Sequence, residues 1–476
     1  MAMKCQHTKE LSAREDKRRI YGEHLTSLQI FEQYILPEIR NKLYNYLWVD
    51  LFCGTGNLIL PILKYIPPEE RIKFFLKHTF LFDIQEEMIN KAVKNAVSLG
   101  IPEEVARQRI LRRDTIKDYP TFILESALPV FHITNPPYLY KGFIFKNSNK
   151  RLLEYFSGEF GDYQDLYQLA MMNDLKHGIK NMIYIIPSNF LFGASISNKI
   201  RDDFLKFYMI KKAIIFEKKI FEHTGTNVCI CFFERKPTPK RERIVFEGVK
   251  VNNEEKRKVY VLDPKNHFRA GSKFEEFVSE FRAKNHLKVS FYLTAEEVDA
   301  NKGTNAISVI DVNSFKGKGY EKKIIYVNDK LAEKIKSNVL FVKTLDTGRQ
   351  EGRAGLYVIK EVYGVDGILV SKAKYRTHPI QVFLYPPIPI EIQILLKDYF
   401  NTLLEHFRDI TDSEFMTTYK YSNSEYTRKY LGLSQVKALI ETFPYESLKE
   451  ECILNEFTNI VKSRSAENLI SFVKSL

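Results

Sequence analysis

The chain has 476 residues, 44% of them hydrophobic, so it can bury a sizeable core, and its composition excludes disordered and collagen-like chains. Lys and Arg number 72 against 59 Asp and Glu, a net charge of +13 that favours a polyanionic partner. Five cysteines are too few for a disulfide scaffold. No long apolar run and no apolar leader stand out, so we expect a cytoplasmic protein with no membrane partner.

Short apolar runs alternate with helical patterns in the first half of the chain. Strands are expected at residues 46–52, 79–82, 109–112, 130–134, 182–186, 212–216 and 227–234. Helical patterns cover residues 57–65, 85–99 and 163–177. This order predicts an α/β fold with a doubly wound, mostly parallel sheet.

Residues 235–243 are charged and carry two prolines, which is typical of a linker. Beyond them the alternation stops. Residues 244–390 look irregular and partly β, residues 390–409 are helical, and residues 434–476 carry two amphipathic helices. We therefore predict two domains, residues 1–240 and residues 241–476, the second a mixed α+β domain.

A glycine turn follows the first predicted strand. It reads Asp50-Leu51-Phe52-Cys53-Gly54-Thr55-Gly56, and glycines there let the backbone approach a ligand closely. Asp83 ends the next strand, where an acidic side chain can accept hydrogen bonds from both hydroxyls of a ribose. Ile59 stands where a dinucleotide motif needs its third glycine, so a nicotinamide cofactor is disfavoured. The turn alone is also compatible with a purely packing role.

The segment Asn135-Pro136-Pro137-Tyr138 follows the fourth predicted strand. Two prolines fix φ and remove two backbone donors. The Asn135 side-chain oxygen and the Pro136 carbonyl can then each accept one hydrogen of a planar amino group, and Tyr138 can stack on the ring that carries it. The alternative is a rigid turn that caps a strand, which the upstream glycine turn makes less favourable.

Together these motifs resemble the S-adenosylmethionine (SAM) dependent DNA N6-adenine methyltransferases, specifically the γ class found in type II restriction-modification systems. Gly22-x-x-x-Thr26 is similar to the family's N-terminal cofactor motif, and the long C-terminal extension matches the γ order. The resemblance covers about residues 17–236. It departs from the family at Leu51, where many members have proline.

The resemblance implies a Rossmann-like methyltransferase fold, SAM as cofactor, and a C-terminal target-recognition domain. Asn135, Pro136 and Tyr138 would be catalytic, and Pro137, Tyr138 and Phe221 would contact the target base. The implied cofactor residues are Thr26 at the methionine carboxylate, Asp50 at its amino group, Phe52, Gly54 and Gly56 in the turn, Asp83 at the ribose, and Ile84 and Asp114 at the adenine. No metal is implied.

The implied reaction transfers a methyl group to adenine N6 in duplex DNA after the base leaves the helix. Methylation at cytosine C5 is disfavoured, because no cysteine follows a proline. N4-cytosine enzymes usually have serine at the position of Asn135. Methylation of RNA adenine or of a protein glutamine amide, and a binding module with a decayed active site, stay open as alternatives.

The C-terminal half carries no motif of its own. Two basic segments have chemistry suited to base edges and phosphates, and their candidate contacts are Arg349, Gln350, Arg353, Lys372, Lys374 and Arg376. Residues 419–430 are a weaker third candidate, and a solvated basic loop is the alternative for each segment. We expect a monomer that binds double-stranded DNA, with a separate cognate restriction endonuclease as a candidate partner.

Overall fold

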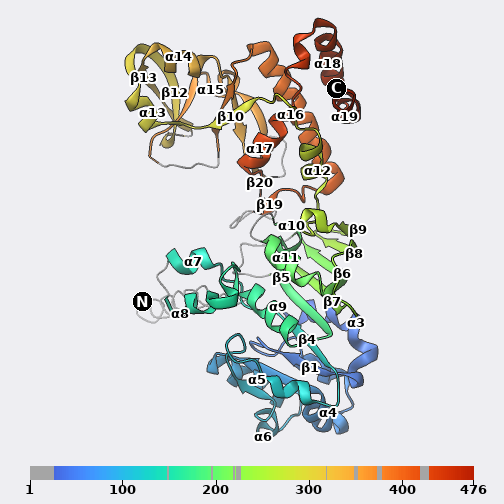
Figure 1. Cartoon of the computed structure of the whole chain (residues 1–476). Helices are drawn as coiled ribbons and strands as arrows, with labels where there is room; N and C mark the ends of the chain where they lie inside the picture. Colours follow the sequence, from blue (N-terminus) through green and yellow to red (C-terminus); the bar gives the residue numbers. More distant parts are fainter. Residues whose placement is uncertain are drawn as a thin grey trace, which may run out of the picture. The chain divides into compact units, whose positions relative to one another are not determined.

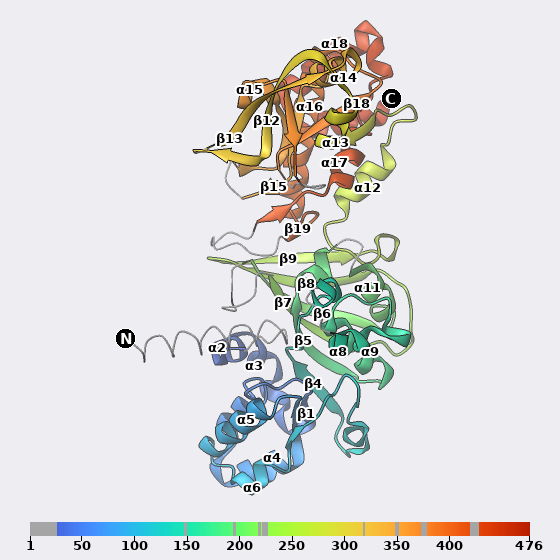
Figure 2. The ribbon, with the colours of Figure 1, turned by 90° about the vertical axis from the view of Figure 1, so that its left-hand side faces the viewer.

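The computed structural model describes residues 26–146, 150–193, 197–217, 220, 227–317, 319–347, 352–372, 378–418 and 428–476. These residues form two compact units, the first ending at Ala270 and the second beginning at Gly271. Figures 1 and 2 show the first unit in blue to yellow-green and the second in yellow to red. No helix of the described part is long and apolar enough to cross a membrane.

The first unit is built on a nine-stranded sheet in the order β3-β2-β1-β4-β5-β7-β6-β8-β9. Its strands are β1 Leu47–Asp50, β2 Thr79–Asp83, β3 Ile110–Arg112, β4 Val130–Thr134, β5 Asn181–Pro187, β6 Tyr208–Phe216, β7 Val228–Arg235, β8 Ile244–Val251 and β9 Glu255–Leu262. Strands β3 to β5 pair in parallel, whereas β7 is antiparallel to both neighbours. The α/β prediction is therefore confirmed.

Both faces of this sheet are covered, because its strands are apolar on both sides. Within β5, Tyr184 and Ile186 belong to one hydrophobic cluster and Ile183 and Ile185 to the other. Helix α9 (Leu166–Lys176) lies in the first cluster and α5 (Glu86–Ser98) in the second, on either side of the sheet (Figure 2). Cys229 and Cys231 of β7 are both buried in this core.

The shorter helices of the first unit are α2 Leu28–Ile30, α3 Leu36–Ile39, α4 Arg71–His78, α6 Glu103–Ala106, α7 Lys141–Lys146, α8 Lys150–Leu153, α10 Asn189–Phe192 and α11 Asn198–Phe204, with a π-helix at Phe31–Ile35. The prediction of a helix over residues 57–65 is wrong. Only Leu60–Tyr65 is helical, as a 3₁₀ helix with Pro61 in its first turn.

The expected linker at residues 235–243 lies between two strands of one sheet. Strand β8 pairs in parallel with β6, and β9 pairs with β8, so both extend the first sheet. Lys236 is buried, with its Nζ donating to the carbonyls of Leu205 and Lys240. The first compact unit thus continues through Ala270, past residue 240, where the charge and prolines of this segment suggested a boundary.

The second unit is a mixed α+β body with two four-stranded sheets, β10-β18-β14-β16 and β11-β17-β12-β13, and a small third sheet, β15-β20-β19. Its strands are β10 Lys288–Phe291, β11 Leu293–Thr294, β12 Lys302–Lys316, β13 Gly319–Val327, β14 Leu340–Lys343, β15 Leu345–Asp346, β16 Gly355–Val358, β17 Gly367–Val370, β18 Ile380–Tyr385, β19 Thr417–Thr418 and β20 Lys429–Tyr430. Its helices are α12 Lys273–Glu280, α13 Ala295–Ala300, α14 Asp329–Lys336, α15 Ile359–Tyr363, α16 Ile390–Thr411, α17 Leu433–Ile440, α18 Glu451–Ser463 and α19 Ala466–Ser475.

The C-terminal segment holds three helices where two were expected. Arg464 ends α18 with a left-handed φ of 55°, and the Ser465 side chain then caps α19 by accepting from the Asn468 N–H. A serine at an N-cap position is a recognisable start signal, so the break could have been read from the sequence.

We predict that Gly248→Val destabilises the first unit. A Cβ at Gly248 would lie 2.4 Å from the Tyr260 ring of β9, so the larger side chain must displace that ring, at a cost of about 1–3 kcal/mol. Trp48 is the chain's one tryptophan and is buried in this unit, so its fluorescence during urea unfolding reports on this unit alone.

Val245→Thr is the matched control, since Val245 lies on β8 and is 60% exposed. Its urea unfolding transition, followed by Trp48 fluorescence, should match that of the wild type. If Gly248→Val also left the transition unchanged, β8 and β9 would not be part of the first unit's cooperative core.

Candidate active site

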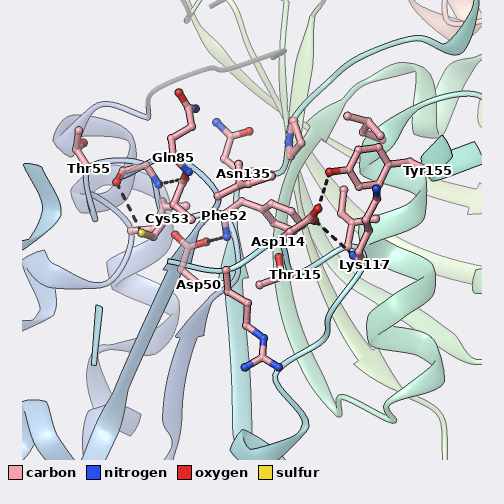
Figure 3. Close-up of a pocket in the computed structure, with 18 of the residues that line it drawn as sticks. Asp50, Phe52, Cys53, Thr55, Gln85, Asp114, Thr115, Lys117, Asn135 and Tyr155 are labelled. Carbon is pink, nitrogen blue, oxygen red and sulfur yellow. Dashed lines mark hydrogen bonds between the residues drawn. The ribbon is translucent and has the colours of Figure 1, made fainter. Parts of the chain in front are cut away.

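A cavity of about 480 Å³ lies where the parallel strands β1, β2, β3 and β4 end. The carboxyl ends of such strands meet at one edge, which is where open α/β sheets bind ligands. The predicted site residues that line the cavity are Thr26, Asp50, Phe52, Gly54, Asp83, Ile84, Asp114, Asn135 and Pro137. Figure 3 shows Asp50, Phe52 and Asn135 close together at its centre.

The glycine turn takes the shape that the sequence suggested. Gly54 and Gly56 both have left-handed backbones, with φ of 53° and 85°. A Cβ at Gly56 would lie 2.5 Å from Leu60 Cδ1, so only glycine fits there. Gly56 does not line the cavity; its role in the structure is to shape the turn.

Asp50 ends β1 and is completely buried. Its Oδ1 accepts from the Phe52 N–H at 3.0 Å and from Thr134 Oγ1 at 2.6 Å. Its Oδ2 has no hydrogen-bond partner among the described residues, although it is buried. Burial raises the pKa of Asp50 to about 6, while the bond from Thr134 acts in the opposite direction. An unpaired buried carboxylate oxygen at a cavity wall is suited to a cationic ligand.

Asp83 and Asp114 follow the next two strands. The Asp83 carboxylate is oriented by two backbone donors, with Gly54 N–H at 2.9 Å from Oδ2 and Gln85 N–H at 2.8 Å from Oδ1. Asp114 Oδ2 accepts from the Tyr155 hydroxyl at 2.6 Å. Ile84, beside Asp83, is 45% exposed and lines the cavity as an apolar surface.

Asn135 stands at the end of β4, on the same cavity as Asp50. Its Nδ2 donates to Thr26 Oγ1 at 3.0 Å, and its Oδ1 accepts from the Tyr138 hydroxyl. Asn57 Nδ2 donates to the Thr26 carbonyl at 2.8 Å, so Thr26 joins the glycine turn to the Asn-Pro-Pro-Tyr segment. This arrangement fixes the direction of the Asn135 amide.

The two prolines and Tyr138 are placed differently from one another. Pro137 lines the cavity, whereas Pro136 is buried and is not among its lining residues. Tyr138 does not line it either. Its ring packs against both hydrophobic clusters and lies edge-on to Tyr167, and its hydroxyl also donates to the Ile185 carbonyl at 2.7 Å.

The lining residues that the sequence analysis did not predict include Asn57, described above, and two others with clear contacts. Thr115 Oγ1 donates to the Leu51 carbonyl at 2.8 Å, and its position directly after Asp114 was a usable signal. Tyr155, near α8, places its hydroxyl on Asp114 at the right of Figure 3. No spacing rule pointed to Tyr155, because the segment that carries it has no periodic pattern.

Seven further residues are expected to contact the target base or the DNA, and the structure places none of them on this cavity. Phe221, Arg349, Gln350, Lys374 and Arg376 lie outside the described residues. In the second unit, Arg353 pairs with Glu405 of α16, and Lys372 is exposed. The described residues include no cluster of three or more potential metal ligands.

A family model for N-6 DNA methylases matches residues 22–318, more than half of the chain. The chain belongs to the N-6 DNA methylase family. The match includes all the cavity residues named above and continues into the second unit. The resemblance seen in the sequence is thus confirmed at the level of the family.

Solved structures with a similar fold include the methyltransferase subunit of a type I restriction-modification system from Streptococcus thermophilus, the M protein of the type I restriction enzyme EcoKI, and the type IIG restriction endonuclease BpuSI. The first is 18% identical over 48% of this chain and 47% of that chain, with a TM-score of 0.35. The other two are 10% identical over 66% and 64% (TM-score 0.36), and 9% identical over 92% and 61% (TM-score 0.40). This N-6 DNA methylase therefore spans less than two thirds of each. No protein of curated function matches it.

The cavity of this N-6 DNA methylase fits SAM, whose methionine end carries an ammonium group and whose sulfur is a sulfonium. Three carboxylates, Asp50, Asp83 and Asp114, face a space of suitable size. The unpaired Asp50 Oδ2 offers an acceptor for the ammonium group. Asp83 offers acceptors for ribose hydroxyls, and Ile84 an apolar surface for the adenine.

We predict that SAM affinity falls as the pH drops below about 6, because the pKa of Asp50 is raised to about 6 and only its ionised form pairs with an ammonium. Affinity falls toward low pH because protonation of Asp50 removes the negative charge that attracts the ammonium group. Isothermal titration calorimetry between pH 5 and pH 7.5 should give a constant dissociation constant above about pH 7. Below the pKa it should rise by about tenfold per pH unit.

Asp50→Asn is the matched control for this titration. It should bind SAM weakly at every pH and lose the dependence. A wild-type dissociation constant that stays constant down to pH 5 would contradict the assignment of Asp50 to the ammonium group.

Proposed function

We propose that this protein is a site-specific DNA adenine-N6 methyltransferase that transfers a methyl group from SAM to an adenine turned out of duplex DNA. The observation that supports it most strongly is one cavity that holds both the Asp50 carboxylate and the Asn135 amide. The Asp50 carboxylate suits the methyl donor, and the Asn135 amide suits an amino group that accepts the methyl. SAM, when bound, supplies a sulfonium methyl group that an amine nitrogen can take.

Asn135 would act on the acceptor. The N6 lone pair of adenine is delocalised into the ring, so the nitrogen is a poor nucleophile. Asn135 Oδ1 and the Pro136 carbonyl would each accept one N6 hydrogen and favour a pyramidal nitrogen, so that positioning and electrostatics lower the barrier.

Tyr138 offers a way to free the Asn135 oxygen for this task. Its hydroxyl has two acceptors, Asn135 Oδ1 and the Ile185 carbonyl at 2.7 Å. When the amino group reaches Asn135, the Tyr138 proton can stay with Ile185, so no buried donor loses its partner. Contacts of Pro137 and Phe221 with the base remain part of the proposal, whereas stacking by Tyr138 would require its ring to leave Tyr167 and the Ile185 carbonyl.

The proposed assignment to the γ class of type II modification enzymes rests on the order of the motifs. The cofactor motif precedes the Asn-Pro-Pro-Tyr segment and a long C-terminal region follows, which is the γ order of type II modification enzymes. On this proposal the protein is a cytoplasmic monomer that protects DNA from a separate restriction endonuclease.

A substrate panel separates the proposal from its alternatives. Purified protein with methyl-labelled SAM should label unmethylated duplex DNA, and leave RNA and glutamine-containing protein unlabelled. Label in RNA or protein would mean that the protein methylates an amino group in that substrate instead. SAM binding without any transfer would support a binding module with a decayed active site.

We predict that Asn135→Ala lowers the turnover number by about 10²–10³-fold or more, because a preorganised polar group at the reacting centre is lost. SAM affinity should stay within about threefold of wild type, since the bond from Asn135 to Thr26 is a single neutral hydrogen bond. Radiolabel transfer to DNA and calorimetry measure the two quantities.

Asn135→Asp is the matched control because it keeps acceptor oxygens in the same shape. It should retain more turnover than Asn135→Ala. Equal loss in both variants would mean that the acceptor oxygen is not what Asn135 contributes.

We propose that the second unit reads the DNA at the end where the candidate segments meet. Strand β18, entered from the segment around Lys372, pairs with β14 through Ile380 and Val342. Strand β15, which follows β14 in the chain, pairs with β20 through Leu345 and Tyr430. Three separate basic segments of the sequence thus begin or end in one neighbourhood.

Two exposed cations mark this end among the described residues, Lys372 and Arg428. The Lys372 backbone N–H donates to Asn313 Oδ1 at 3.2 Å, which ties its segment to β12. Arg353 already pairs with Glu405, and Lys429 is buried with its Nζ on the Asp412 carbonyl, so neither is as available for phosphates.

We predict that Lys372→Ala together with Arg428→Ala weakens DNA binding and lowers its salt dependence. Each lost phosphate contact should reduce the slope of log affinity against log salt by about 0.9. Fluorescence anisotropy with duplex DNA at several salt concentrations measures this slope, and the SAM dissociation constant should not change.

Lys302→Ala is the matched control. Lys302 is exposed at the opposite end of β12, so its removal takes away one positive charge, against two in the double variant, and should leave the slope unchanged. Equal effects from both sites would contradict the placement of the DNA surface.

A further inference from the structure

A buried histidine–aspartate pair lies beside the glycine turn without lining the cavity. His132, in the middle of β4, is 1% exposed, and Asp174 of α9 is 0% exposed. Asp174 accepts hydrogen bonds from His132 Nδ1, from the Tyr119 hydroxyl at 2.9 Å and from the Tyr184 hydroxyl at 2.6 Å. The methyl-transfer chemistry proposed above makes no use of this pair.

The other ring nitrogen of His132 points to the turn. The Leu51 backbone N–H donates to His132 Nε2 at 3.2 Å. A backbone N–H can only donate, so Nε2 carries no proton and the proton sits on Nδ1, facing Asp174. Asp174 therefore selects the tautomer that leaves Nε2 as an acceptor.

Leu51 is held from both sides by side chains of other segments. Its N–H is bound by His132, and its carbonyl accepts from Thr115 Oγ1 at 2.8 Å. Thr134, two residues after His132 on the same face of β4, bonds Asp50 Oδ1. Strand β4, which Asn135 follows, thus holds the backbone and the carboxylate of the turn.

We propose that His132, oriented by Asp174, is a positioning residue that sets the affinity of the turn for SAM. It fixes Leu51, and so holds the neighbouring Asp50 carboxylate in its place on the cavity lining. The choice of SAM as ligand rests on the proposed function, whereas the contact between His132 and the turn does not.

Two amide substitutions separate the two bonds of His132. In His132→Asn the amide nitrogen can replace Nδ1 on Asp174, but no atom reaches the Leu51 N–H. In His132→Gln the longer side chain can place its oxygen where Nε2 was. Calorimetry on the full chain should show a SAM dissociation constant about tenfold higher for His132→Asn. For His132→Gln it should stay within about threefold of wild type.

Tyr184→Phe is the control for a purely structural effect. It removes a bond to the same Asp174 without touching the turn, so it should lower the Trp48 unfolding midpoint but not the SAM affinity. The proposal is overturned if His132→Asn binds SAM like the wild type. It is also overturned if all three variants lose affinity in proportion to stability.

A second pair of variants covers the case in which His132→Asn does not fold. Thr115→Val removes the other anchor of Leu51, while Thr115→Ser keeps the hydroxyl. The valine variant should bind SAM more weakly than the serine variant, and equal affinities would overturn the proposal.

A wild-type protein that binds no SAM would instead contradict the proposed function. One that binds SAM without transferring methyl leaves these comparisons valid.

Discussion

The parallel pairing of β1 with β4 is the constraint on which the rest of the site depends. Val49 of β1 lies opposite His132 of β4, so the two strands end side by side. Asp50 directly follows Val49, Asn135 is the third residue after His132, and the bond from Thr134 Oγ1 to Asp50 Oδ1 joins the two strand ends at 2.6 Å. The Asp50 carboxylate and the Asn135 amide, which we propose serve the methyl donor and the acceptor, are thereby held on one cavity by the backbone register.

Burial of the Asp50 carboxylate makes the cavity suited to the cationic ligand that we propose. Asp50 is desolvated enough to raise its pKa to about 6, and one of its oxygens has no partner among the described residues. An unpaired buried carboxylate is costly, and an ammonium group in the cavity relieves that cost. Asp83 differs, because two backbone N–H groups hold it and it needs no ligand for its orientation.

Residues at strand ends could be predicted from the sequence, and residues that depend on packing could not. Asp50, Asp83, Asp114 and Asn135 each follow an apolar strand, so the α/β pattern alone brings them to one edge. Strands β8 and β9 lie in a region expected to be partly β, but charge and proline before them suggested a linker to a second domain, whereas pairing with β6 joins them to the first sheet. The inward packing of the Tyr138 ring and the pairing of His132 with Asp174 depend on contacts between distant segments. The departure from proline at Leu51 also gains a physical reason, since leucine keeps the N–H that His132 accepts.

A crystal structure of the protein with S-adenosylhomocysteine bound would show whether Asp50 and Asn135 serve the donor and the acceptor on one cavity. We expect the ammonium group of the ligand within hydrogen-bond distance of Asp50 Oδ2, its ribose hydroxyls on Asp83, and its sulfur facing Asn135. A ligand bound elsewhere, or one whose sulfur faces away from Asn135, would contradict it.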